Sequence, residues 1–201
     1  MTLRLKPAVG DVRTYQVRMK QFSGSSTRSS TAVLGLRIAC RATKRDRVTL
    51  EAAYTYREGS SDSESSSFIV DAQILGGTPF KWTLTARNEL LAVDREDMAI
   101  VPVPWMPTFP DGGLKVGMTW KLPAGSFGVA AATTGKVESM DATQVELSVS
   151  DREKSVEGTF RFELKTGLLV RGSLSTLVTK PSGSTSRTTI TVEPQSPPQK
   201  S

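Results

Sequence analysis

Apolar and polar residues alternate at every second position along most of the chain. The alternation is clearest over residues 12–22, 32–43 and 48–56. An extended chain points successive side chains to opposite faces, so this spacing predicts half-buried strands with one apolar face. Shorter segments of the same kind predict further strands over 68–75, 80–84, 90–93, 127–140, 160–164, 174–179 and 188–192.

Polar segments separate the predicted strands. Residues 23–31 and 59–67 are rich in serine and are expected to form loops, and 44–46 a turn. These connections are short enough for an antiparallel meander. A short helix is expected only over 94–100, where Asp94 can cap the first turn. With roughly ten to thirteen strands, the chain is predicted to be all-β, with at most one or two short helices.

A proline-rich segment divides the chain near its middle. Its four prolines fix φ and remove backbone donors, which excludes a central strand or a helix interior. We therefore expect one domain with two β halves, a connection and a disordered tail. The boundaries are 1–101 for the first half, 102–113 for the connection, 114–193 for the second half and 194–201 for the tail.

The second half repeats features of the first in the same order. Val116-Gly117 precedes an aromatic residue, as Val9-Gly10 does. Two later groups share one spacing, Phe80, Trp82, Leu84 and Phe160, Phe162, Leu164. These features predict an internal duplication. The alternative is that any two meandering sheets share alternating strands and turns.

The apolar face of such a sheet must be covered, and the chain has few helical residues to cover it. The sheet is therefore expected to curve strongly, as a half-barrel or barrel, or two sheets must stack. A curved sheet of this size can enclose an apolar ligand. The aromatic residues expected to line such an interior are Trp82, Trp105, Phe109, Trp120, Phe160 and Phe162. The alternative is that they simply fill the core.

The sequence lacks residues that several kinds of catalytic and metal site require. The chain has no histidine, which removes Ser-His-Asp and Cys-His catalysis and most zinc sites. Its single cysteine, Cys40, shares the parity of buried strand positions and is expected to be an inert thiol. Glu51 and Glu146 lie on the polar parity, so they are expected to face solvent rather than to form a catalytic pair. We predict no enzyme activity, no metal site and no cofactor.

The net charge is +6, with basic residues concentrated in the first quarter of the chain. This leaves binding to anionic surfaces as one hypothesis. Nucleic-acid binding is disfavoured, because Tyr54 and Tyr56 share the parity of core residues and are not expected to stack on bases. No run of eighteen apolar residues occurs, so no transmembrane segment is predicted.

Three phrases of the sequence form a recognisable set. They are Val-Gly-Asp before a first strand, Phe-Pro-Asp-Gly-Gly-Leu-Lys-Val-Gly-Met-Thr-Trp at 109–120, and Phe-Glu-Leu-Lys-Thr-Gly-Leu-Leu-Val at 162–170. The set resembles a group of uncharacterised bacterial secreted proteins and lipoproteins. That group is similar in build to the LolA-like lipoprotein carriers, which implies a curved antiparallel sheet around an apolar cavity. The group has no established site, so no functional residue is carried over.

The sequence thus predicts a non-catalytic β protein of the bacterial cell envelope that binds an apolar or lipid-like ligand in the concave face of its sheet. The alternative is a structural or protein-interaction module that pairs with a partner through exposed sheet edges. The N-terminus has no apolar signal region. The expected location is therefore periplasmic or envelope if a signal peptide was removed, and otherwise cytoplasmic.

Overall fold

The computed structural model describes residues 1–23, 28–62, 67–77, 79–94, 106–123, 126–128, 132–179 and 183–195. These form eleven strands, one α-helix and one 3₁₀ turn. In chain order they are β1 (Val12–Ser23), β2 (Ser29–Lys44), β3 (Arg47–Ser61), α1 (Ser67–Leu75), β4 (Phe80–Thr85), β5 (Leu90–Val93), β6 (Thr119–Lys121), η1 (Ser126–Gly128), β7 (Thr134–Met140), β8 (Gln144–Ser150), β9 (Val156–Glu163), β10 (Leu169–Thr179) and β11 (Thr185–Pro194).

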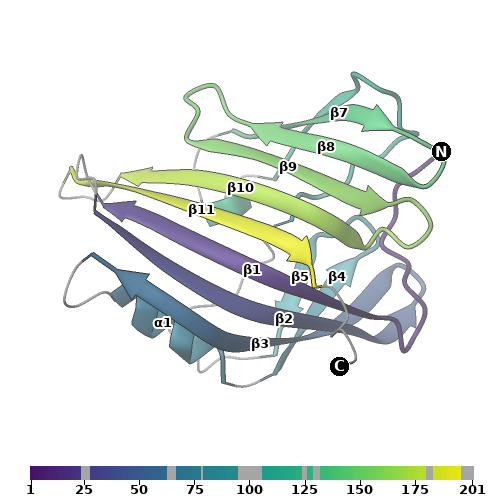
Figure 1. The fold of residues 1–201 in the computed structure, drawn as a ribbon. Helices are drawn as coiled ribbons and strands as arrows, with labels where there is room; N and C mark the ends of the chain where they lie inside the picture. Colours follow the sequence, from purple (N-terminus) through teal and green to yellow (C-terminus); the bar gives the residue numbers. More distant parts are fainter. Residues whose placement is uncertain are drawn as a thin grey trace.

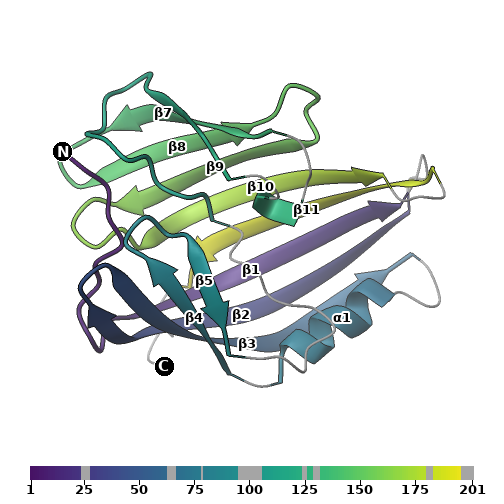
Figure 2. The same cartoon turned by 180° about the vertical axis from the view of Figure 1, so that it is seen from behind.

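All eleven strands belong to one antiparallel sheet, in the order β5-β4-β3-β2-β1-β11-β10-β9-β8-β7-β6. The first five strands and the last six each form a meander, and the pairing of β1 with β11 joins the two meanders. The sheet is not closed, and it bends so that β4 and β5 lie on the same side as α1 (Figures 1 and 2). The all-β prediction is confirmed as an open, curved sheet rather than a barrel.

Three sequence-based assignments were wrong. The strand predicted over 127–140 covers only 134–140, and residues 126–128 form the 3₁₀ turn η1. Residues 67–75 form α1, where a strand over 68–75 was predicted. The buried positions of this segment, Phe68, Ala72 and Leu75, have helical spacing, but isoleucine and valine between them obscure it. The serine-rich loops are also shorter than predicted. β2 begins at Ser29 and β3 continues to Ser61, because backbone pairing extends into these polar residues. The short helix expected over 94–100 lies almost wholly outside the described residues.

Alternation sorts the side chains between two faces. The inner face, on the side of α1, carries the main apolar core, which draws residues from both meanders and includes Val17, Leu36 and Leu147. The opposite, outer face carries polar and charged residues such as Arg37 and Arg161. Cys40 is buried in the core, as its parity predicts.

The two meanders begin with the same hydrogen bonds. The amide of Gly10 donates to the carbonyl oxygen of Cys40 at 3.0 Å, and the amide of Gly117 donates to that of Val137 at 2.8 Å. Cys40 and Val137 each donate their own amide back to the residue after that glycine, at 2.9 Å in both cases. Both glycines have positive φ. The start of β1 therefore meets β2 in the same way as the start of β6 meets β7.

Two register shifts recur in both meanders, while a third, between Val33 and Leu34, occurs only between β2 and β3. The register between β2 and β3 shifts after the pair Cys40–Leu50, and that between β7 and β8 shifts after Val137–Leu147. The pairs β4–β5 and β9–β10 each carry a further shift near their turn. Bulges need a particular local backbone, so their recurrence at matching positions ties the two meanders together residue by residue.

The strand register changes one of the residue matches that the sequence predicted between the two halves. Trp82 pairs with Leu50 across β3 and β4, and Phe160 pairs with Leu147 across β8 and β9. Trp82 is therefore the counterpart of Phe160. The sequence comparison had matched Phe80 with Phe160, two residues away, because both placements preserve the alternation.

The sheet ends in short strands on both sides. β5 has four residues and β6 has three. Short edge strands present few unpaired backbone groups to another chain. In the described part of the chain, no helix is both long and apolar enough to cross a membrane.

Candidate functional site

The first eight residues, which we call the N-terminal strap, close one end of the inner face. The amide of Leu5 donates to the carbonyl oxygen of Ala86 at 2.8 Å, and that of Lys6 donates to the carbonyl oxygen of Thr166 at 2.8 Å. Ala86 lies in the β4–β5 turn and Thr166 in the β9–β10 turn. The strap therefore bridges corresponding turns of the two meanders, and its two leucines are buried in the main core.

A second segment, residues 106–114, lies against the strap and is called the connector here. The amide of Leu114 donates to the carbonyl oxygen of Met1 at 2.6 Å, and the amide of Phe109 donates to that of Arg87 at 2.7 Å. Figure 2 shows the N-terminal segment running along the end of the sheet opposite to α1. Strap and connector together cover this end of the inner face.

The predicted ligand-lining aromatics lie in the main core. Phe109 from the connector meets the ring of Phe162 at 5.0 Å edge to face, and Phe162 stacks on Phe160 at 6.3 Å. Trp82, Phe109, Phe160 and Phe162 are fully buried, while Trp120 is partly buried and donates its indole N–H to the carbonyl oxygen of Thr108 at 2.9 Å. Trp105 lies outside the described residues. The five described side chains therefore pack within one core, and their role in ligand binding stays a prediction.

The opposite end of the inner face is covered differently. There α1 packs through Phe68 and Ala72 onto Ala32 of β2, which forms a small apolar cluster separate from the main core. Met19 and Tyr56 are only partly buried, and they contact both clusters. Ile190 of β11 pairs with Met19, faces the same side and is also half-buried. We call Met19, Tyr56 and Ile190 the inner strip.

Uncharged polar side chains border the inner strip. Gln21 pairs with Thr188, and Thr188 pairs with Thr176, so these residues form one row across β1, β11 and β10. They share the parity of Met19 and Ile190 and are half-buried. Their side chains make no hydrogen bond to any described residue. We call this row the polar rim. Along β1, β11 and β10, the inner face thus changes from apolar side chains to hydrogen-bonding side chains within two residues.

Helix α1 carries apolar residues on both of its sides. Phe68, Ala72 and Leu75 are buried, whereas Val70 and Ile74, one turn apart, are 53% and 49% exposed. Val178, further along the inner parity of β10 than the polar rim, is 45% exposed. Exposed apolar side chains therefore occur at the same end of the sheet as the inner strip.

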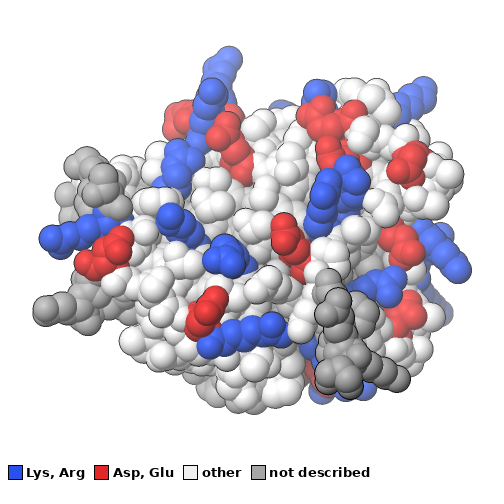
Figure 3. Space-filling view, in the orientation of Figure 1, with Lys and Arg blue, Asp and Glu red and all other residues white. Residues whose placement is uncertain are grey.

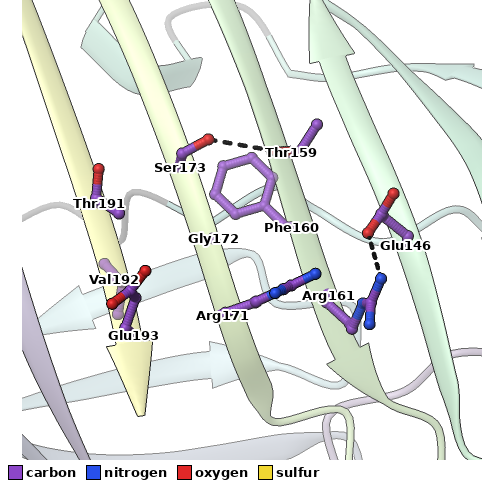
Figure 4. A pocket seen from close by; sticks show the side chains of 10 residues that line it. All are labelled: Glu146, Thr159, Phe160, Arg161, Arg171, Gly172, Ser173, Thr191, Val192 and Glu193. Atoms are coloured by element: carbon purple, nitrogen blue, oxygen red, sulfur yellow. Dashed lines mark hydrogen bonds and ion pairs between the residues drawn. The ribbon is translucent and has the colours of Figure 1, made fainter. Parts of the chain in front are cut away.

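The outer face contains a pocket of about 200 Å³ over β8, β9, β10 and β11. Figure 3 shows acidic and basic side chains interspersed over this face. Two rows of side chains border the pocket, one of hydroxyl groups and one of charged groups (Figure 4). The hydroxyl row is Thr159, Ser173 and Thr191, and the charged row is Glu146, Arg161, Arg171 and Glu193. The hydroxyl side chains are shorter than the charged side chains beside them, and this difference in length leaves the pocket.

Sequence analysis identified neither the polar rim nor this pocket. Glu146 was correctly expected on the polar face, where it accepts a hydrogen bond from Arg161 at 2.8 Å. Alternation over 188–192 could have placed Thr188 and Ile190 on one face, but the row that Thr188 forms with Gln21 and Thr176 depends on strand pairing. The pocket could not have been found either, because it depends on which strands are neighbours.

No family model matches the chain, and no curated protein matches it. Among solved structures, one of lipid–protein interactions in lipovitellin aligns with 96% of this chain and 26% of that one, at 9% identity and a TM-score of 0.48. A domain of an outer membrane lipoprotein-sorting protein from Vibrio parahaemolyticus aligns with 95% of this chain and 88% of that one, at 9% identity and a TM-score of 0.22. The chain spans about a quarter of the length of the lipovitellin chain.

Proposed function

We propose that this protein is a non-catalytic binder of a lipid-like amphiphile, which it holds on the inner face of its sheet at the α1 end. The observation that carries the proposal is the inner strip. Met19 and Tyr56 contact both buried clusters and Ile190 contacts the main core, yet all three remain partly exposed. Covering such surface with an acyl chain stabilises the complex by about 0.8 kcal/mol per buried methylene.

The polar rim supports an amphiphile rather than a plain hydrocarbon. Gln21, Thr176 and Thr188 offer amide and hydroxyl groups beside the apolar strip, and these have no partner among the described residues. Half-buried polar groups are more stable when hydrogen-bonded. A ligand with an uncharged hydroxyl- or ester-bearing head, such as a monoacylglycerol, satisfies both the strip and the rim.

The ligand is expected to enter at the α1 end. The strap and the connector cover the other end with backbone hydrogen bonds and buried leucines. By contrast, α1 is nine residues long and exposes Val70 and Ile74. A short helix with few tertiary contacts is the element that opens at low cost.

The test is a charge placed on the inner strip. Ile190→Glu is expected to weaken the binding of a fluorescent monoacylglycerol at least about tenfold, because its carboxylate must lose water in the complex. Thr189→Glu is the matched control, since residue 189 faces outwards and pairs with Lys20. It should bind as the unchanged protein does. Met19→Ser provides a second variant if Ile190→Glu fails to fold. Equal affinity of all four proteins would overturn the proposal.

We also propose that the sheet arose by internal duplication, with β1–β5 corresponding to β6–β10. Support comes from the matching first hydrogen bonds, the recurring bulges and the positive φ of Asn88 and Gly167 in corresponding turns. β11 has no counterpart in the first half and joins the two units through β1. An experimental structure in which the two sets of five strands fail to superpose along this register would count against it.

For location, we propose the bacterial cell envelope, on the basis of the sequence resemblance. Cell fractionation with an antibody against the protein tests this, and recovery from the cytosol alone contradicts it. The alternative role, pairing with a partner through a sheet edge, gains little from β5 and β6, because both strands are short.

A further inference from the structure

We propose that the outer-face pocket over β8–β11 is a binding site for a phosphate group. It lies on the opposite face of the sheet from the inner strip, so the proposal is independent of lipid binding. Four adjacent strands contribute its lining, and each strand supplies residues of the outward parity. The site is therefore built on four strands that each pair with a neighbouring strand on both sides.

The pocket is lined by two arginines and two glutamates, and one ion pair forms among these four side chains. Arg161 pairs with Arg171 across β9 and β10, so the two side chains start as direct cross-strand neighbours. The guanidinium of Arg161 donates to a carboxylate oxygen of Glu146 at 2.8 Å, whereas Arg171 makes no ion pair or hydrogen bond with any described residue. Figure 4 shows Arg171 directed towards Arg161 and away from Glu193. Arg161 is thus paired with Glu146, whereas Arg171 and Glu193 form no ion pair with each other.

Like charges side by side on a strand pair are unfavourable, and an anion between them relieves the repulsion. A guanidinium presents parallel N–H donors that match two oxygens of a phosphate. Hydroxyl groups of Ser173 and Thr191 lie in the neighbouring row of the same pocket and can donate to further oxygens. A tetrahedral oxyanion uses both rows at once, which a planar carboxylate does less well.

The residues have distinct expected roles. Arg171 supplies a guanidinium group that makes no ion pair with a described residue, together with its forked donors. Glu146 competes with the anion for Arg161, so its removal should strengthen binding. This opposite effect of two neighbouring substitutions is the signature of the site, because a general loss of structure would weaken binding in both variants.

The test is a titration with inorganic phosphate, followed by amide NMR at constant ionic strength. The unchanged protein should show saturable shifts around Arg171 and Ser173. Arg171→Ala is expected to weaken binding about tenfold or more, and Glu146→Gln to tighten it severalfold. Arg37→Ala is the matched control, because Arg37 also lies exposed on the outer face without a hydrogen bond to a described residue, and it should leave the affinity unchanged. If Arg171→Ala does not fold, Arg171→Lys keeps the charge and should bind with intermediate affinity.

A second arm separates two sources of the phosphate group. Sedimentation with phosphatidic acid vesicles, in the presence and absence of competing inorganic phosphate, shows whether a lipid head group is preferred to the free anion. Either result supports the site if it requires Arg171. Shifts that do not saturate, or equal affinities of the Arg171→Ala and Arg37→Ala variants in both arms, would overturn it.

Discussion

Replacing Gly167 by alanine is expected to lower the free energy of unfolding by about 3 kcal/mol or more. Gly167 has φ of +68°, and a Cβ atom there would lie 2.2 Å from the carbonyl oxygen of Arg4. The left-handed conformation alone costs an alanine about 1–2 kcal/mol. The steric conflict adds to this, because the strap must move away and expose Leu3 and Leu5, each of which contributes about 1.5–3 kcal/mol by its burial.

A control variant separates the conformational cost of an alanine at positive φ from the cost of displacing the strap. Gly117 has φ of +83°, with no atom within 4 Å of the Cβ position. Gly117→Ala should therefore cost only the conformational part, about 1–2 kcal/mol. Urea unfolding of the two variants measures the difference. Equal losses for Gly117→Ala and Gly167→Ala would show that the strap does not hold the two meanders together.

Truncating Phe162 to alanine is expected to lower the free energy of unfolding by about 3–5 kcal/mol. The ring is fully buried and contacts Phe109 of the connector at 5.0 Å and Phe160 at 6.3 Å. Its removal leaves a cavity at the junction of sheet and connector, where packed rings on both sides limit collapse. The measurement is again the urea midpoint, with an unchanged slope showing that the denatured state is the same.

This prediction also separates the two interpretations of the aromatic residues. Phe22 is a useful control, because it is only half-buried, on the outer parity, beneath the amine of Lys20 at 4.7 Å. Phe22→Ala should cost about 1 kcal/mol. If Phe162→Ala costs no more than that and instead abolishes ligand binding, the ring lines a ligand cavity rather than filling the core.

The alternation over the first strands predicted the inner and outer faces correctly, because a half-buried strand leaves the same signature wherever it lies in a sheet. Tyr15 and Val17 are buried and Arg18 is exposed, as expected. The order of the strands could not be read in this way. Alternation is the same for every neighbour, so the pairing of β1 with β11, on which the polar rim depends, required the structure.

The pattern of apolar residues gave a wrong prediction where both helical and strand spacing fit the same segment. Residues 67–75 contain apolar residues at both helical and strand spacing, and packing against Ala32 and Met19 selects the helix. Likewise, Phe80 and Trp82 are interchangeable in an alternating pattern, so alternation alone does not decide which of them has the same place in the register as Phe160. The phosphate pocket needs arginines from two strands, and Arg161 and Arg171 are adjacent only after the sheet has formed.

Tyr15 illustrates how the sheet is fixed at its centre. Its hydroxyl group donates to the carbonyl oxygen of Leu169 at 2.6 Å, which links β1 to β10 across β11. Burial raises the pKa of the phenol well above its ordinary value, so the hydroxyl group keeps its proton and remains a donor at physiological pH. This hydrogen bond between the two meanders therefore does not change with pH in the physiological range.

The most direct test of ligand binding is native mass spectrometry of the protein after delipidation and exposure to a monoacylglycerol. The account predicts a complex of one amphiphile per chain that forms in the unchanged protein and in Thr189→Glu, and that is lost in Ile190→Glu. Absence of any bound amphiphile in the unchanged protein, or a complex that survives Ile190→Glu undiminished, would contradict it.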